Sequence, residues 1–104
     1  MTIAVHDVPD RRRYEIEEDG DVVGFVTYRI HRGIIDFIHT EVDPSHTGRG
    51  LAGTLISHAL DDARRRELGV LPHCPFVRSY IDAHAEEYLD LVPVDRRAEF
   101  GWGD

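Results

Sequence analysis

Residues 41–55 read EVDPSHTGRGLAGTL, and this stretch decides how the chain must fold. Gly48 and Gly50 stand directly before a run whose apolar residues recur at helical spacing. Glycine loses more conformational entropy on folding than other residues do. One of its main uses is to let another group come very close to the backbone. The start of a helix offers free N–H groups and a positive dipole end, so we expect that group to be an anion.

The residues before this stretch predict three strands. Residues 13–17 alternate between polar and apolar side chains, and 22–30 and 34–42 are rich in β-branched and aromatic residues. Turn-forming residues at 18–21 and 31–33 separate the strands. Three strands joined by such short turns form an antiparallel meander.

The residues after the glycines predict a helix, because their apolar positions recur at steps of three and four. These positions are Leu51, Leu55, Ile56, Ala59, Leu60 and Ala63. We expect the helix to run from about residue 50 to residue 67 and to be stopped by Gly69. A short strand at 70–74 and a second helix over 75–84 follow.

The C-terminal part of the chain carries weaker signals. Residues 86–91 predict one more turn of helix. We expect the tail from Pro93 to be frayed, although Phe100 and Trp102 are candidates to anchor it.

Strand 34–42, the long helix and strand 70–74 make a βαβ unit, so the two strands are expected to be parallel with a right-handed crossover. The predicted fold is therefore α/β (α+β): a three-stranded antiparallel meander, then the βαβ unit, then a C-terminal helix. The glycines lie at the carboxyl end of strand 34–42, which is where open α/β sheets usually bind ligands.

Length, charge and cysteine content exclude several classes of function. The 104 residues predict a single domain over 1–104, with no apolar run near the roughly 18 residues that span a membrane. Residues 1–13 lack a signal pattern, and the single cysteine cannot form an internal disulfide, so we expect a cytoplasmic protein. A net charge of −8 argues against nucleic-acid binding, which needs a basic surface.

The glycine turn has other interpretations that the local motif leaves open. Ser45 or Thr47 can cap the helix while the glycines only allow the turn. Gly53 completes the pattern G-x-G-x-x-G, but a dinucleotide fold places that pattern after its first strand. The phosphate-binding loop of nucleotide hydrolases needs a lysine, and this chain contains none.

Three segments together resemble a known family. They are HTEVDPSHTGRGLAGTLISHALDDARRRELGV at 39–70, CPFVRSYIDAH at 74–84 and EYLDLV at 87–92. The first resembles the acetyl-coenzyme A motif of the GNAT acetyltransferase superfamily, and the chain is similar to its minimal subfamily over residues 14–92. Thr47 departs from that subfamily, which usually has arginine there, and Arg49 can compensate. The segment 84–88 also carries one extra residue.

The resemblance implies acetyl-coenzyme A as the cofactor, with the coenzyme A diphosphate on the amides of residues 47–53. It implies that the pantetheine arm fills the gap between two splayed parallel strands, as an added strand would. The cofactor-binding residues it implies are Thr40, Glu41, Val42, Thr47, Gly48, Arg49, Gly50, Leu51, Ala52, Gly53 and Tyr80.

Two residues are candidates for catalysis. Cys74 and His39 lie near the carboxyl ends of the two parallel strands, and a Cys–His pair supports nucleophilic acyl transfer through an acetyl-cysteine. The resembling subfamily carries the same pair. Direct transfer, with Glu41 as base and Tyr80 as acid, is the alternative mechanism. Each residue also has a structural interpretation, because a lone cysteine is commonly a small buried hydrophobe and His39 alternates with core positions.

The predicted function is an acetyl-coenzyme A-dependent acyltransferase, with an amine on a small molecule or a protein as acceptor. The alternatives are a coenzyme A-binding module without turnover and an interaction domain that binds a peptide strand. The seven histidines show no metal-ligand spacing, so no metal site is predicted.

Overall fold

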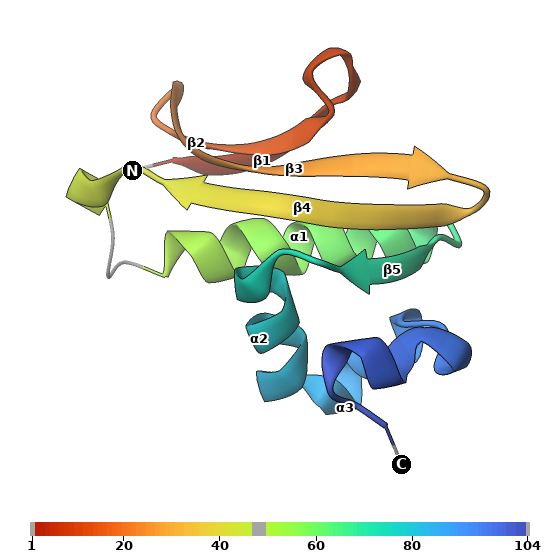
Figure 1. Cartoon of the computed structure of the whole chain (residues 1–104). Coiled ribbons are helices and arrows are strands. Elements are labelled where there is room, and N and C mark those ends of the chain that lie inside the picture. The colour runs from red at the N-terminus through yellow and green to blue at the C-terminus, as the bar shows by residue number, and fades with distance from the viewer. Residues whose placement is uncertain (1, 47–49, 104) are drawn as a thin grey trace.

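The computed structural model describes residues 2–46 and 50–103. Its centre is one five-stranded sheet in which the strands follow each other in chain order. The strands are β1 (Ile3–Val8), β2 (Arg13–Glu18), β3 (Asp21–His31), β4 (Ile34–Val42) and β5 (Gly69–Pro72). The first four are antiparallel, and β4 and β5 are parallel, as the βαβ pattern predicted (Figure 1).

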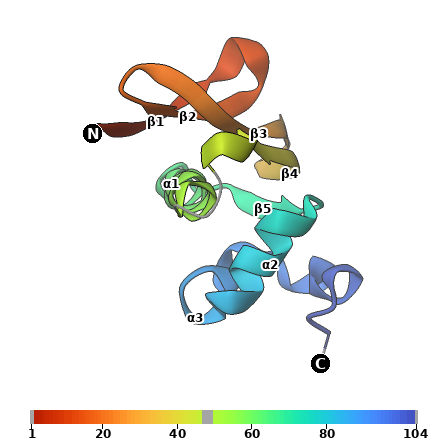
Figure 2. The same ribbon diagram turned by 90° about the vertical axis from the view of Figure 1, so that its left-hand side faces the viewer.

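The helices all follow β4 in the sequence. They are α1 (Leu51–Arg65), α2 (Pro75–Ala83) and α3 (Ala85–Tyr88). Short 3₁₀ turns occupy Pro9–Arg11, Pro44–His46, Leu89–Leu91 and Val94–Phe100. Helix α1 lies along one face of the sheet, and α2 and α3 lie beyond it on the β5 side (Figure 2). No described element covers the opposite face of β2, β3 and β4.

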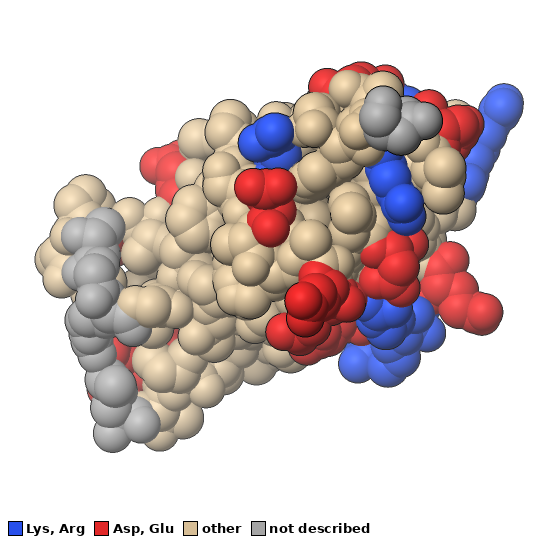
Figure 3. Space-filling view, turned by 90° about the horizontal axis from the view of Figure 1, so that it is seen from below, with Lys and Arg blue, Asp and Glu red and all other residues tan. Residues whose placement is uncertain are grey.

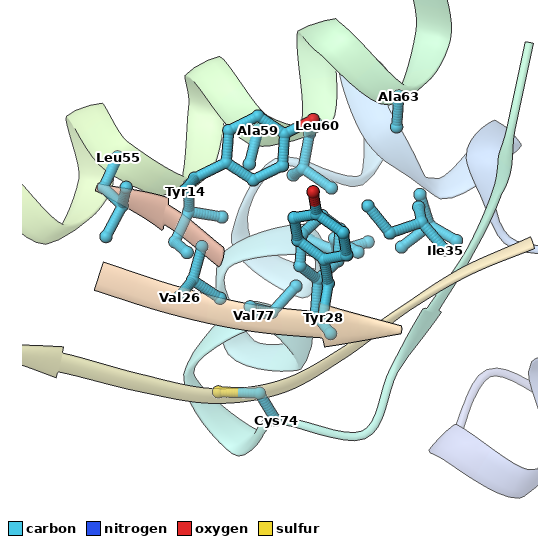
Figure 4. Close-up of a cluster of buried hydrophobic side chains, with 14 of the residues drawn as sticks. Tyr14, Val26, Tyr28, Ile35, Leu55, Ala59, Leu60, Ala63, Cys74 and Val77 are labelled. Atoms are coloured by element: carbon cyan, nitrogen blue, oxygen red, sulfur yellow. The ribbon is translucent and has the colours of Figure 1, made fainter. Parts of the chain in front are cut away.

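The apolar stripe of α1 forms the core against β2, β3 and β4. Leu55, Ala59 and Leu60 pack with Tyr14 and Val26 of the sheet, and all five side chains are buried (Figure 4). Burial of this kind contributes about 25 cal/mol for each Å² of apolar surface removed from water. The helical spacing in the sequence therefore predicted the face of α1 that holds the fold together.

Strand β1 was not anticipated, so the meander has four strands instead of three. It is an edge strand that pairs only with β2, from Ile3↔Glu18 to Val8↔Arg13. None of its residues is fully buried. Its position depends on backbone pairing more than on an apolar face, and such an edge leaves a weak sequence signal.

The end of α1 was predicted at the wrong residue. Glu67, with φ of 58°, takes the left-handed position, while Leu68 N–H donates to the Ala63 carbonyl at 2.9 Å. This is the Schellman arrangement, here built without glycine. Gly69 instead begins β5, where a Cβ would stand 2.8 Å from Cδ1 of Ile34. That glycine serves close packing of the strand, not helix termination.

The C-terminal segment is anchored instead of frayed. Phe100 is buried, and its carbonyl accepts from Nε of Arg78 at 2.6 Å. The indole N–H of Trp102 donates to Asp82 at 3.0 Å. Arg97 donates to the Val92 and Leu89 carbonyls. These contacts hold the segment against α2 and the turn at Leu89–Leu91.

Candidate functional site

The parallel strands separate where the sequence predicted an opening. The β4–β5 ladder runs from Ile34↔Gly69 to Phe37↔Pro72, and Cys74 N–H then donates to the Phe37 carbonyl at 2.8 Å. At Pro75 the chain turns into α2. Within the described residues, β4 from Ile38 to Val42 has no neighbouring strand on this side. Thr40, Glu41 and Val42 therefore lie along a free strand edge.

The start of α1, which follows β4 in the chain, has no side-chain cap among the described residues. Gly50 occupies the N-cap position with φ of 74°, and no described side chain accepts a hydrogen bond from the first turn. Ser45 bonds to Asp43 instead, so it is not the cap that the simpler interpretation proposed. The N–H groups of Leu51, Ala52 and Gly53 are therefore available to an anion. Thr47, Gly48 and Arg49 lie outside the described residues.

Tyr80 lies against the start of α1. A Cβ on Gly53 would stand 3.6 Å from Cε2 of Tyr80, which is ordinary contact. The ring of Tyr80 stacks on His84 with centroids 4.2 Å apart. Tyr80 therefore forms a wall beside the first turns of α1, a position compatible with the cofactor-binding role predicted for it.

Cys74 is at the inner end of the opening. Its side chain is 2% exposed, and Sγ lies 3.2 Å from Oγ1 of Thr40. Figure 4 shows it at the edge of the core cluster, beside a strand of the sheet. The residue also stands at the N-cap of α2 in an extended conformation. The thiol is therefore buried next to the free edge of β4, with a hydroxyl as its polar neighbour.

The structure does not bring His39 and Cys74 together. Thr27 pairs with His39 and Tyr28 with Phe37, so Ile38 is an extra residue in β4 and forms a bulge. The bulge reverses the alternation, and Thr40 turns to the Cys74 side while His39 turns to the open face of the sheet. The expectation that His39 shares a face with Ile35 and Phe37 was wrong for this reason.

On the open face, His39 pairs with Glu41. Nε2 of His39 and Oε2 of Glu41 are 3.0 Å apart, and the two side chains are 57% and 62% exposed. The ring of Phe25 lies beside His39, with centroids 6.3 Å apart. A carboxylate and an imidazole thus stand together, both within reach of a molecule that arrives from solvent.

A pocket of about 380 Å³ adjoins Glu41 on the sheet. The guanidinium of Arg13 lies over the ring of Phe25, 4.4 Å from its centroid. Asp43 also lines the pocket, and hydrogen bonds from the backbone and side chain of Ser45 lower the pKa of its carboxyl. Sequence reasoning missed this pocket. Arg13, Phe25 and Glu41 occupy outward-facing positions of their strands. This pattern can be recognised in the sequence only once the bulge at Ile38 is known.

Charge is unevenly spread over the molecule. Residues 51–60 of α1 contain no Asp, Glu or Arg. Seen from below, most charged side chains gather toward the end of the molecule that carries β5 and the C-terminal segment (Figure 3). None of the helices in the described part of the chain is both long and apolar enough to cross a membrane.

Comparison with known proteins places this geometry in a family. The sequence model of the GCN5-related N-acetyltransferases matches residues 13–91, which include β2 to β4, the glycine turn, α1, β5 and α2. The chain belongs to the GCN5-related N-acetyltransferase family.

A sequence relative supports the same family. Over 67 residues the chain is 36% identical to streptothricin acetyltransferase of Streptomyces lavendulae, a match that covers 62% of this chain. The chain spans only 35% of the length of that relative.

Solved structures share the fold. The solution structure of a GCN5-like protein from Staphylococcus aureus has a TM-score of 0.66 at 20% identity and covers 86% of this chain and 87% of its own. A ribosomal-protein-alanine N-acetyltransferase from Brucella melitensis has a TM-score of 0.54 at 23% identity, covering 78% and 61%. These likenesses support the fold.

Proposed function

We propose that this GCN5-related protein transfers an acetyl group from acetyl-coenzyme A directly to an amine, and that Glu41 takes up the proton of the amine. The observation that carries the proposal is the His39–Glu41 pair, which is exposed on the strand that also borders the opening between β4 and β5. A family fold with a carboxylate at this place has the two parts that acyl transfer needs. One part is a place for the donor, and the other is an acceptor for the proton.

The residues present fit the cofactor. The uncapped amides of Leu51, Ala52 and Gly53 suit a diphosphate, and the free backbone of Thr40 to Val42 suits an extended amide-bearing arm. Tyr80 closes the side of α1 next to these amides. When bound, acetyl-coenzyme A supplies an acetyl group activated as a thioester.

Glu41 and His39 act on the acceptor. An amine attacks only through its free electron pair, so its ammonium form must first lose a proton. Glu41 is exposed and takes that proton from the side of the acceptor. His39 holds the carboxylate by the contact of Nε2 with Oε2 and so fixes its orientation. The neighbouring Asp43 adds negative charge that attracts a cationic acceptor into the pocket.

An acetyl-cysteine route is the second candidate. It is favoured by one observation, the placement of the Cys74 thiol 3.2 Å from the Thr40 hydroxyl beside the same opening. In this route Cys74 carries the acetyl group, and Thr40, not His39, is its polar neighbour. The 2% exposure of Cys74 favours direct transfer, because a nucleophile must be reached by the donor.

The experiment compares four proteins for release of free thiol from acetyl-coenzyme A with a panel of small primary amines and amine-bearing peptides. Direct transfer predicts a rate loss of about 10²-fold or more in Glu41→Gln. It predicts little change in Cys74→Ala and in the control Glu86→Gln, an exposed glutamate of α3. A loss in Cys74→Ala alone, with an acetyl adduct on the intact wild-type protein, overturns direct transfer in favour of the acetyl-cysteine. Binding without turnover in every protein identifies a coenzyme A-binding module.

A further inference from the structure

A second pocket lies away from the opening between β4 and β5, beyond the last β2–β3 pair. It measures about 380 Å³ and is lined by Asp7, Pro9, Arg12, Tyr28, Arg29, Ile30 and Arg66. Its three arginines come from three different parts of the chain: the turn before β2, strand β3 and the end of α1. The pairing of β2 with β3 begins only at Arg13↔Thr27. Beyond this pair, the turn that carries Arg12 lies beside β3 in place of a strand.

The charge of this pocket contrasts with that of the whole chain. Three arginines and one acidic residue, Asp7, line it, in a protein of net charge −8. Neither Arg12 nor Arg29 makes a side-chain hydrogen bond or an ion pair within the described residues. Arg66 is paired with Asp7 and Asp62, so Arg12 and Arg29 supply the positive charge that an anion entering the pocket neutralises.

The floor of the pocket is held in place before any ligand arrives. Tyr28 is 6% exposed, and its hydroxyl donates to Oδ1 of Asp7 at 2.5 Å. The guanidinium of Arg66 lies 3.5 Å from Oδ2 of Asp7 and 3.4 Å from the Tyr14 hydroxyl. Arg12 is fixed through its main chain, since its carbonyl accepts from Tyr28 N–H at 2.9 Å. One of the three guanidinium groups, that of Arg66, and the main chain of Arg12 are therefore ordered before binding, which reduces the freedom lost on binding.

The geometry points to a site for a phosphate monoester of a small molecule, and we propose this as a second ligand site that is independent of the acetyltransferase function. A phosphoryl group offers three oxygens and two negative charges, which suits guanidinium groups approaching from several sides. A carboxylate offers only two oxygens in one plane. Ile30 is partly exposed and lies with Pro9 on the same pocket, so the organic part of an ester gains apolar contact.

Calorimetric titration with phenyl phosphate, inorganic phosphate and benzoate at constant ionic strength tests the site. We expect phenyl phosphate to bind most tightly and benzoate at least tenfold more weakly. Arg12→Gln and Arg29→Gln are each expected to weaken phenyl phosphate at least tenfold. The matched control is Arg11→Gln, which makes the same charge change next to the pocket without lining it and removes only a contact with Glu15.

Three results overturn the proposal. One is an equal loss of affinity in Arg11→Gln, which indicates unspecific charge attraction. The second is the absence of binding heat with phenyl phosphate, and the third is equal binding of benzoate. The Gly50→Val variant separates this site from the coenzyme A site, because phenyl phosphate affinity is expected to be unchanged there even if acetyl-coenzyme A binding is lost.

Discussion

At the scale of single residues, Gly50 has the conformation on which the donor site depends. Its φ of 74° lies in the left-handed region, and no described atom lies within 4 Å of the place that a Cβ would take. The glycine therefore does not make room for a neighbouring side chain of the folded protein. Its open side is free for a ligand that approaches the first amides of α1.

We expect Gly50→Val to weaken acetyl-coenzyme A binding at least tenfold and to lower the free energy of unfolding by about 1–2 kcal/mol, the cost of left-handed backbone for a residue with a side chain. Calorimetric titration and urea unfolding measure the two effects. Gly20→Val is the control, because Gly20 has φ of 88° and equally open surroundings in the β2–β3 turn. Equal loss of binding in both variants contradicts a donor site at Gly50.

At the scale of elements, the helices were predictable and the irregular strand positions were not. Helices α1 and α2 begin within a residue of their predicted starts, because apolar periodicity and Pro75 are strong local signals. The bulge at Ile38 has no such signal, since IIDFIHTEV reads as one continuous strand. The turn at Glu67 likewise uses a residue that does not favour the left-handed conformation, so Gly69 was the natural but wrong choice.

The same local reasoning predicted the geometry of the candidate site only for features that depend on position along the chain. The start of α1 at the carboxyl end of β4 follows from element order, and the opening beside Cys74 was implied by the family resemblance. The partners of Cys74 and His39 depend on which way each side chain of β4 points. One inserted residue changes that direction for every later position.

The contact between α1 and the turn after α3 makes part of the stability sensitive to acid. The guanidinium of Arg64 donates two hydrogen bonds to Asp90, at 2.8 and 3.0 Å, and thereby lowers the pKa of the Asp90 carboxyl below its ordinary 3.8. The folded state therefore binds this proton less readily than the unfolded state. The resulting stabilisation is present above about pH 4 and is lost as pH falls through the lowered pKa.

We expect Arg64→Gln to lose a few tenths of a kcal/mol at pH 7, because both partners are about half exposed and are screened by water. The loss is expected to be smaller at pH 3 than at pH 7, because the carboxylate that Arg64 binds gains protons as pH falls toward its lowered pKa. Urea unfolding at the two pH values measures the difference. Arg32→Gln serves as control, since Arg32 makes no ion pair within the described residues. A loss in Arg64→Gln that is the same at both pH values contradicts the assignment.

At the scale of the whole molecule, a buried polar cluster joins the sheet to the far end of α1. Tyr14 of β2 is fully buried and donates its hydroxyl proton to Asp62 of α1, which is 5% exposed. Arg65 and Arg66 provide the positive partners of this carboxylate. Burial, followed by the charge of Asp7, raises the pKa of the Tyr14 hydroxyl, which therefore stays protonated as a donor.

Removing either Tyr14 or Asp62 takes away one hydrogen-bond partner of the buried group that remains, which costs about 1–3 kcal/mol. We therefore expect Asp62→Ala and Tyr14→Phe each to lower the free energy of unfolding by that amount, measured by urea unfolding. The double variant is expected to lose less than the sum, with a coupling of about 0.5–3 kcal/mol. Strict additivity contradicts a direct link between sheet and helix through these two side chains.

The additional residue at Ile38 has a consequence for the architecture of the reaction. It places different groups on the two sides of β4. A thiol and a hydroxyl lie behind the strand, and a carboxylate and an imidazole lie in front of it. Under the proposed function, a donor behind the strand and an acceptor in front of it are divided by the thickness of one strand. The two substrates can meet only at the edge of β4 where the described chain has no neighbouring strand. A shortened loop or one deleted residue in this segment would turn the later side chains of β4 to the opposite faces, so that each substrate would meet the residues placed for the other.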